Sequence, residues 1–242
     1  MSFADALELI EGVEGWLTDA QARTLWDAAG AVPAGRSIVE IGSFRGRSTI
    51  VLALAAGERV RVVAIDPHGG GDRGPQEISP DPARGDLDHA AFGANVERAG
   101  VSGQVTHVRA RSSDALEAVA GEVGLLYIDG AHRYGPARAD IEQWGARVPE
   151  GGSMLIHDSF SAIGVTLAQA RVLMLSRGWR YLGRVGSLAQ YAREPLGPAP
   201  RLANVARQAA GLAYFARNLL VKVLITLRLP RLLGRPGAHW PY

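Results

Sequence analysis

Acidic and histidine side chains that could bind a cation or move a proton follow two apolar stretches of this sequence. Asp129 follows the first stretch and His132 comes three residues later, whereas His157 and Asp158 follow the second. Carboxylates at the ends of neighbouring strands can together hold an octahedral Mg²⁺ ion that keeps positions open for substrate oxygens. A histidine, with an ordinary pKa of about 6.5, can accept a hydroxyl proton at neutral pH. These residue types could therefore activate a hydroxyl group.

A glycine-bearing turn follows an earlier apolar stretch, with the pattern Glu40-x-Gly42-x-x-x-Gly46-x-Ser48. A strand that leads through such a turn into a helix N-terminus makes a site for the polar part of a nucleotide-like cofactor. We expect the two glycines to let the backbone approach that ligand closely. The spacing differs from the Gly-x-Gly-x-x-Gly pattern of dinucleotide-binding turns. It favours S-adenosylmethionine over a dinucleotide.

Polar residues recur at the ends of the other predicted strands. Asp66 follows one of them, and Arg111 and Ser112 follow another. In open α/β sheets, ligands bind in the crevice beyond the carboxyl ends of the strands. We therefore expect these residues, the glycine turn and the acid–histidine pair to border one crevice.

The elements that must position these residues alternate between strands and helices. The predicted strands are 37–41, 61–65, 104–108, 125–128, 153–156, 179–184 and 187–192; the predicted helices are 3–12, 18–30, 46–56, 88–99, a short one from Ser113, 136–147, 161–177 and 201–229. Such alternation implies parallel pairing with right-handed crossovers. The continuous apolar character of the strands indicates helices on both faces of the sheet.

With these motifs, residues 30–192 resemble the class I S-adenosylmethionine-dependent methyltransferases. Within that class, the chain is similar to metal-dependent O-methyltransferases related to catechol O-methyltransferase and the macrolide-sugar O-methyltransferases. The resemblance implies a Rossmann-like α/β fold with a mostly parallel seven-stranded sheet. It also implies S-adenosylmethionine as the methyl donor.

The resemblance assigns cofactor contacts along the crevice. It implies that Ser48 binds the methionine carboxylate, Asp66 the ribose hydroxyls, and Ser112 and Ser113 the adenine edge. The other cofactor-binding candidates lie around the glycine turn and at the fourth strand: Glu40, Gly42, Ser43, Gly46 and Asp129. Turn or helix capping before Pro67 is the alternative for Asp66, and helix capping is the alternative for the two serines.

The resemblance also implies that Asp129 and Asp158 are metal ligands and that His132 is the general base. Relatives supply a third oxygen ligand beside the position of Asp158, but here its neighbours are His157 and Ser159. His157 would suit Mn²⁺ or another transition ion better than Mg²⁺, and water or Ser159 could complete a Mg²⁺ shell. One alternative is a metal-independent methyltransferase in which Asp158 bonds locally and His132 acts alone. Another makes His132 an ordinary surface or helix-entry histidine.

Charge and composition divide the chain. No acidic residue follows Glu194, and the seven cations beyond it exceed the net charge of +2, so residues 1–194 are acidic overall. We expect a methyltransferase domain over 1–194, with N-terminal helices over 1–30 and a lid loop over 67–86, for which a disordered surface insertion is the alternative. A linker and a basic amphipathic helical arm are expected over 195–242. The acidic body argues against a nucleic-acid partner.

The expected activity is methyl transfer from S-adenosylmethionine to a hydroxyl of a small acceptor, for example a sugar or a glycosylated metabolite. An NAD-binding oxidoreductase is the rival, and the glycine spacing and the lack of a Tyr-x-x-x-Lys pair disfavour it. The absence of cysteine and of a signal-peptide pattern leads us to expect a cytoplasmic enzyme. For the C-terminal helix, packing on the domain, a homodimer contact and a peripheral contact with anionic lipid remain open, and the homodimer is favoured.

Overall fold

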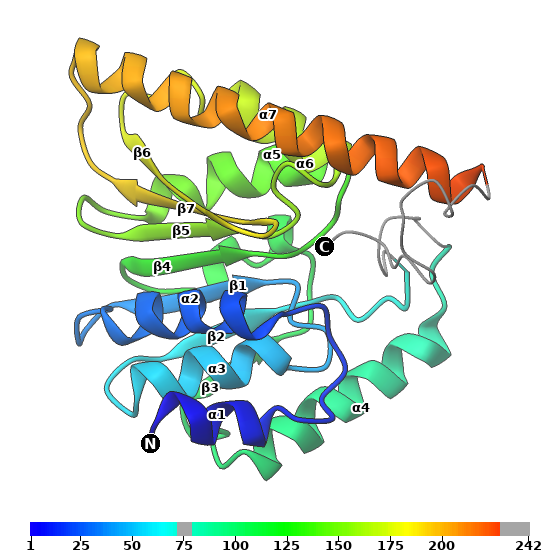
Figure 1. The fold of residues 1–242 in the computed structure, drawn as a ribbon. Coiled ribbons are helices and arrows are strands. Elements are labelled where there is room, and N and C mark those ends of the chain that lie inside the picture. The colour runs from blue at the N-terminus through cyan, green and yellow to red at the C-terminus, as the bar shows by residue number, and fades with distance from the viewer. Residues whose placement is uncertain (72–78, 228–242) are drawn as a thin grey trace.

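Seven strands make a single sheet at the centre of the molecule, and only β7 runs opposite to the other six (Figure 1). The computed structural model describes residues 1–71 and 79–227. The sheet order is β3-β2-β1-β4-β5-β7-β6. The strands are β1 (Ser37–Ile41), β2 (Val62–Ile65), β3 (Val105–Val108), β4 (Val123–Ile128), β5 (Ser153–Ile156), β6 (Trp179–Val185) and β7 (Leu188–Arg193). The Rossmann-like fold with a seven-stranded, mostly parallel sheet is confirmed.

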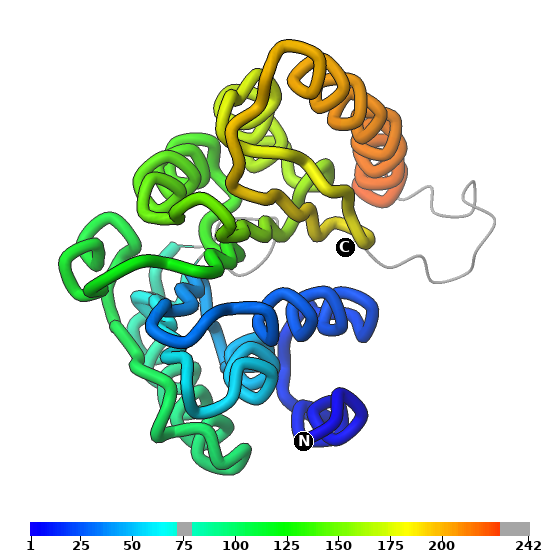
Figure 2. The backbone as a smooth tube through the Cα atoms, turned by 90° about the vertical axis from the view of Figure 1, so that its left-hand side faces the viewer, coloured from blue at the N-terminus to red at the C-terminus, as the bar shows by residue number. Residues whose placement is uncertain are grey.

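Helices lie on both sides of this sheet (Figure 2). They are α1 (Phe3–Leu9), α2 (Asp19–Gly30), α3 (Arg47–Ala56), α4 (Pro82–Arg98), α5 (Tyr134–Gln143), α6 (Ile163–Val172) and α7 (Pro198–Thr226), with short 3₁₀ turns η1 (Ser112–Asp114), η2 (Leu116–Ala118) and η3 (Gly145–Arg147). Ser2 and Thr18 begin α1 and α2 with capping boxes, in which side chain and backbone satisfy each other's free donors.

The core lies on both faces of the sheet because successive strand residues point to opposite sides. In β1, Ile38 faces a cluster formed with α1 to α4, whereas Val39 and Ile41 face a second cluster formed with α5 and α6. Burial of apolar area on both faces explains why the central strands have continuous rather than alternating apolar sequences.

The strand register brings the expected site residues to one level. Ile41 pairs with Ile65 on one side and with Ile128 on the other, and Ile128 pairs with Ile156. The residues that follow these isoleucines therefore lie along one edge of the sheet. The chain order reverses between β1 and β4, which is the switch point at which α/β sheets bind ligands.

Several element boundaries differ from the prediction: the helices expected over 3–12, 136–147 and 161–177 are shorter, and the one expected from Ser113 is the pair of 3₁₀ turns η1 and η2. Two further differences change the expected loop and linker. Helix α4 begins at Pro82, because Asp81 caps the helix and proline fits its first turn, so the loop expected over 67–86 ends earlier. Helix α7 begins at Pro198 for a similar reason, inside the expected linker. In the sequence, Asp81-Pro82 and Gly197-Pro198 resemble loop segments, because proline and glycine are common in loops. Part of the expected lid loop, residues 72–78, and residues 228–242 of the C-terminal arm lie outside the described residues.

Candidate active site

A cleft of about 850 Å³ opens at the carboxyl ends of the parallel strands. Its lining includes eight of the predicted site residues: Gly42, Asp66, Ser112, Ser113, Asp129, His132, His157 and Asp158. Glu40, Ser43, Gly46 and Ser48 do not line it. Phe44 and His68, from the turns that carry Gly42 and Asp66, and Trp16, from the connection between α1 and α2, also line it.

Gly42 holds the floor of this cleft together. Its φ is +88°, and a Cβ added there would lie 2.2 Å from the carbonyl oxygen of Asp129. Gly46 begins α3 with φ +87°, and its Cβ would lie 3.2 Å from the Phe92 ring. We expected both glycines to make room for a ligand, but here the close approach is to other parts of the protein. The Gly42 contact brings the turn after β1 against the turn after β4.

Glu40 is buried below the turn rather than exposed in the cleft. Its carboxylate accepts hydrogen bonds from the hydroxyls of Ser48 and Thr49, both in α3. Burial raises the pKa of Glu40 to about 8 despite these two hydrogen bonds. The Ser48 hydroxyl is therefore engaged with β1. The Ser43 hydroxyl is buried and has no hydrogen-bond partner among the described residues.

Asp66 joins two loops at the cleft. One carboxylate oxygen accepts a hydrogen bond of 2.9 Å from the Phe44 backbone N–H, and the other accepts one of 2.7 Å from that of His68. Phe44 and His68 have φ values of 44° and 45°, in the left-handed region that non-glycine residues seldom adopt. Asp66 thus stabilises two strained backbones while its carboxylate lines the cleft.

Beside Asp66, the segments on the two sides of the undescribed stretch 72–78 pack tightly against each other at the cleft. The Asp81 N–H donates to the Gly69 carbonyl over 3.0 Å. A Cβ on Gly70 would lie 1.9 Å from the Asp81 oxygen, and one on Gly85 would lie 1.9 Å from the His68 oxygen. The chain therefore leaves and returns at one tightly packed point.

The two serines at the far end of the cleft are engaged with neighbouring acids. Ser112 donates to Asp140 over 2.5 Å, and Ser113 donates to Asp114 over 3.0 Å. Burial raises the pKa of Asp140 to about 6, although the Ser112 hydrogen bond acts in the opposite direction. Asp140 lines the cleft and was missed in the sequence because α5 places it there from outside any motif.

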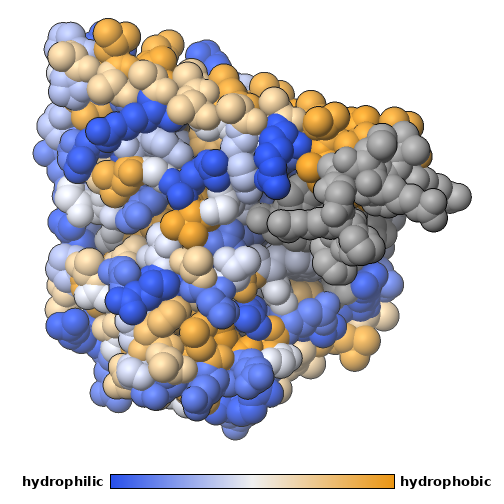
Figure 3. All heavy atoms as spheres, in the orientation of Figure 1, coloured by the Kyte–Doolittle hydropathy of each residue, from blue (hydrophilic) through white to orange (hydrophobic). Residues whose placement is uncertain are grey.

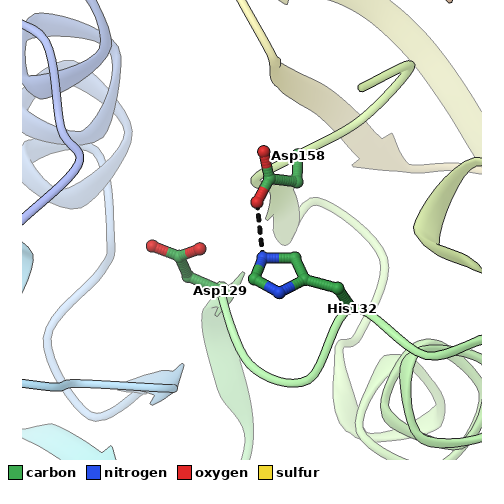
Figure 4. Close-up of side chains that lie close together, drawn as sticks. All are labelled: Asp129, His132 and Asp158. Atoms are coloured by element: carbon green, nitrogen blue, oxygen red, sulfur yellow. Dashed lines mark ion pairs between the residues drawn. The ribbon is translucent and has the colours of Figure 1, made fainter. Parts of the chain in front are cut away.

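Asp129, His132 and Asp158 come together near the centre of the cleft (Figure 4). Each offers a possible ligand atom within 4.8 Å of those of the other two. His132 Nε2 lies 2.5 Å from Asp158 Oδ2. The turns after β4 and β5 therefore bring two carboxylates and an imidazole into one group, and His132 rather than His157 completes it.

His157 and Tyr127 hold the Asp129 carboxylate from below. His157 Nδ1 lies 3.1 Å from Asp129 Oδ1 and 3.7 Å from Asp158 Oδ2, and its side chain is buried. The Tyr127 hydroxyl donates to Asp129 Oδ2 over 3.0 Å. Tyr127 was missed in the sequence, although its position two residues before Asp129 places both side chains on the same face of a strand.

The charges of this group shift one another's pKa values. Burial lowers the pKa of His132, but the hydrogen bond to Asp158 and the charges of Asp158 and Asp129 outweigh it, so the pKa is raised. Burial also lowers the pKa of His157, but the charges and hydrogen bonds of Asp129 and Asp158 outweigh it, so this pKa is raised as well. Burial would raise the pKa of Asp158, yet the two histidines lower it below its ordinary value. The Asp158 carboxylate and the two imidazoles therefore stabilise one another's charged forms, which makes His132 a stronger proton acceptor than an ordinary histidine.

Ser159 is buried and its hydroxyl is already engaged. It donates to the Ile156 carbonyl over 2.7 Å and accepts from the Gln169 amide over 2.7 Å, which leaves one lone pair on its oxygen. Its role as a further metal ligand stays a prediction.

Helix α7 fixes the loop that carries Asp158. The Asn218 amide donates to the Phe160 carbonyl over 3.1 Å, and Lys222 Nζ donates to the Ser161 carbonyl over 2.9 Å. Asp158 and Phe160 have φ values of 54° and 55°. Such conformations persist where surrounding contacts enforce them, and α7 supplies those contacts.

Comparison with known proteins agrees with this geometry. A family model described as a methyltransferase domain matches residues 39–159, which is half of the chain. Catechol O-methyltransferase of Mycobacterium tuberculosis (strain ATCC 25618 / H37Rv) is 32% identical over 152 residues. That alignment covers 62% of this chain and 59% of the relative, so the chain spans less than two thirds of that protein's length.

Solved structures share the fold. Cofactor-bound Rv0187 from MTB is 24% identical, with a TM-score of 0.58 over 80% of this chain and 89% of that one. The O-methyltransferase TomG from Streptomyces achromogenes, which is involved in tomaymycin synthesis and was solved with SAM, is 17% identical. Its TM-score is 0.55 over 79% of this chain and 89% of that one.

Proposed function

The chain belongs to the methyltransferase-domain family, and we propose that it transfers a methyl group from S-adenosylmethionine to a hydroxyl of a small acceptor. The observation that carries this proposal is the cleft at the switch point of the sheet. It gathers a candidate ribose-binding acid, Asp66, and a candidate reaction group, Asp129, His132 and Asp158, along one wall.

For the donor, Asp66 supports ribose binding because a carboxylate accepts well from two vicinal hydroxyls. Its oxygens already accept from Phe44 and His68, but each carboxylate oxygen has a second lone pair. Ser112 and Ser113 border the region proposed for adenine, and Asp140 could accept a hydrogen bond from an amino group there. Gly42, with Glu40, Ser43, Gly46 and Ser48 beneath it, would form the floor under the methionine part.

In the transfer step, a lone pair of the acceptor oxygen forms the new bond to the methyl carbon. The carbon–sulfur bond breaks with its electron pair going to sulfur, which leaves S-adenosylhomocysteine. His132 takes the hydroxyl proton, and Asp158 stabilises the imidazolium that forms, as their 2.5 Å contact supports. Holding both reactants in one cleft lowers the entropic part of the barrier.

The residues also fit a divalent cation, because two carboxylates and an imidazole converge within 4.8 Å. Asp129 and Asp158 would hold the ion, with His132 or His157 as a nitrogen donor. When bound, such an ion supplies positive charge that lowers the pKa of the acceptor hydroxyl. The nitrogen donors favour Mn²⁺ over Mg²⁺.

Purified protein incubated with methyl-labelled S-adenosylmethionine and a panel of hydroxylated compounds tests the proposal by the gain of one labelled methyl group. The panel contains catechols, because the 32% identical relative is a catechol O-methyltransferase, and sugar-bearing compounds. Calorimetric titration with S-adenosylhomocysteine and with NAD separates the proposed donor from a dinucleotide. Binding of NAD alone would overturn the proposal.

Two roles of His132 are separated by His132→Ala measured at increasing Mn²⁺. As the base, its loss lowers the transfer rate at saturating metal without changing metal affinity. As a ligand, its loss weakens metal affinity instead. His89→Ala, in α4 outside the lining of the cleft, is the matched histidine control. Full activity in the presence of a chelator would leave the metal-independent alternative.

A further inference from the structure

Helix α7 faces the rest of the protein with a largely polar side, on which Phe215 is an apolar residue that packs against the second core cluster. Asn204 accepts from the Tyr181 N–H over 2.6 Å and donates to the Trp179 carbonyl over 3.1 Å, which holds the helix along β6. Gln208 accepts from the Tyr191 hydroxyl over 3.2 Å. With Asn218 and Lys222, these side chains lie within an arc of roughly 80° at 100° per residue. Amphipathic surface helices ordinarily pack their apolar side inward.

The apolar side of α7 is exposed. Leu202, Leu212, Leu219, Leu220, Val223 and Leu227 are all exposed and fall within an arc of roughly 100°. This arc, which we call the apolar stripe, is centred roughly 110° around the helix from the polar side. It is visible along the upper edge of the molecule, where apolar residues over α7 are coloured orange (Figure 3). A contiguous exposed apolar surface of this kind marks an interaction site.

The positive charge around α7 favours anionic lipid over a second copy of the chain as the partner of the apolar stripe. Helix α7 carries no acidic residue, and Arg201 and Arg217 lie roughly 50° and 110° around the helix from the centre of the apolar stripe. The sequence after the helix adds three arginines. Two copies packed through this surface would bring like charges together. Anionic lipid headgroups instead provide opposite charge, while acyl chains accept the leucines and long arginine side chains reach back to the headgroups.

From this combination we propose that the apolar stripe of α7 attaches the protein to the surface of an anionic membrane. The helix lies parallel to that surface, with its polar side still bound to β6 and to the loop after β5. Among the described residues, α7 alone is long and apolar enough to cross a bilayer. Spanning would break its hydrogen bonds to the body and place its arginines in hydrocarbon. Peripheral attachment keeps the hydrogen bonds intact and leaves the arginines at the level of the headgroups.

This attachment holds the cleft near lipid. The C-terminal half of α7 contacts Phe160 and Ser161, two and three residues beyond Asp158, which lines the cleft. The inference does not rest on methyl transfer, because it uses only the surface and charge of α7.

Flotation of the full chain with vesicles tests it, comparing phosphatidylcholine alone with equal parts phosphatidylcholine and phosphatidylglycerol. We expect binding only to the anionic vesicles, and release by high salt because headgroup attraction is screened. The variant Leu220→Glu/Leu227→Glu changes residues that are 58% and 61% exposed, so folding should survive. Vesicle partitioning should fall by roughly tenfold or more for each lost leucine.

The matched control is Leu87→Glu/Leu175→Glu, which adds the same charge at two leucines that are each 68% exposed and lie outside α7. It should bind as the original does. Calorimetry with S-adenosylhomocysteine, expected to be equal in all three proteins, keeps this test separate from that of the proposed function.

Three results would overturn the proposal. One is the absence of vesicle binding, and another is equal loss in the two double variants. The third is undiminished retention on anionic vesicles at high salt, which would show that headgroup charge does not hold the protein there. Light scattering tests the other partner that this surface could bind, a second copy of the chain. A homodimer that the Leu220→Glu/Leu227→Glu substitutions dissociate, together with no vesicle binding, would make this surface a contact between two copies.

Discussion

At the residue scale, Glu40 shows how an acid within a binding motif can serve the scaffold beneath a site. Its carboxylate is fully buried and bonded to Ser48 and Thr49. Because its pKa is raised to about 8, the unfolded chain releases this proton at lower pH than the folded protein does. Its contribution to stability is therefore present below about pH 4.5 and is lost as the pH rises toward 8.

We predict that Glu40→Gln flattens the fall in unfolding free energy between pH 5 and pH 8. The glutamine keeps the shape of the side chain but has no proton to lose. Urea unfolding of both proteins at several pH values measures the two slopes, and the difference between them removes the contributions of the histidine–aspartate group. Parallel slopes would mean that Glu40 is already ionised in the folded protein.

Gly42 allows steric clash and backbone strain to be measured apart. Gly42→Ala places a Cβ 2.2 Å from the Asp129 oxygen at φ +88°, whereas Gly35→Ala has the same φ and nothing within 4 Å. We predict that Gly35→Ala costs about 1–2 kcal/mol of unfolding free energy from strain alone. Gly42→Ala should cost a further 1–3 kcal/mol or so by overpacking. Equal losses in chemical denaturation would show that the two turns separate freely.

At the element scale, the sequence predicts where strands end better than it predicts what the neighbouring hydroxyls bind. Asp66 and Asp129 were expected at the crevice because an apolar run that ends in an acid marks a strand end, and parallel strands end at one edge. Ser48 and Ser112 instead hydrogen-bond to Glu40 and Asp140. A hydroxyl bonds to whichever acceptor the packing brings near, and that is a tertiary property.

The orientation of α7 was similarly beyond the sequence pattern. The periodicity of its arginines and leucines predicts an amphipathic helix and leaves its inward side open. Its asparagine and glutamine side chains decide the orientation, because β6 and the loop after β5 offer them backbone partners. Those partners come from residues 20 to 60 positions away or so, which no local pattern reports.

Asn218 connects α7 to the reaction group, so we predict that Asn218→Ala slows methyl transfer. Without the amide, the Phe160 carbonyl loses its buried donor and the loop with Asp158 relaxes. The rate at saturating substrates should fall roughly tenfold through misplacement of Asp158. The affinity for S-adenosylhomocysteine should be unchanged in calorimetry. Arg207→Ala, exposed on the same helix, should retain the original rate.

At the scale of the whole molecule, α7 completes the domain rather than hanging from it. The expected boundary after Glu194 stays a prediction, but buried hydrogen bonds cross it at Asn204 and Gln208. Their loss would expose Tyr181 and Tyr191, which belong to the second core cluster.

A chain that ends at Leu196 tests this boundary. We predict an unfolding free energy lower by several kcal/mol, at about 1 kcal/mol or more for each lost buried hydrogen bond. The midpoint and slope of urea unfolding together measure it, and a chain that ends at Leu227 is the control because it retains α7. An unchanged unfolding free energy would instead establish residues 1–196 as an independent folding unit.

The glycine-lined base at His68, Gly70 and Gly85 has a practical consequence for engineering. The Asp81–Gly69 hydrogen bond fixes the two ends of the stretch between Gly71 and Ser79 close together. A segment inserted between those ends therefore adds little strain to the rest of the protein. The entropy of closing a longer insert grows only slowly with its length. Segments from other methyltransferases could accordingly be grafted between Gly71 and Ser79, which offers a route to exchange substrate preference while the catalytic floor remains intact.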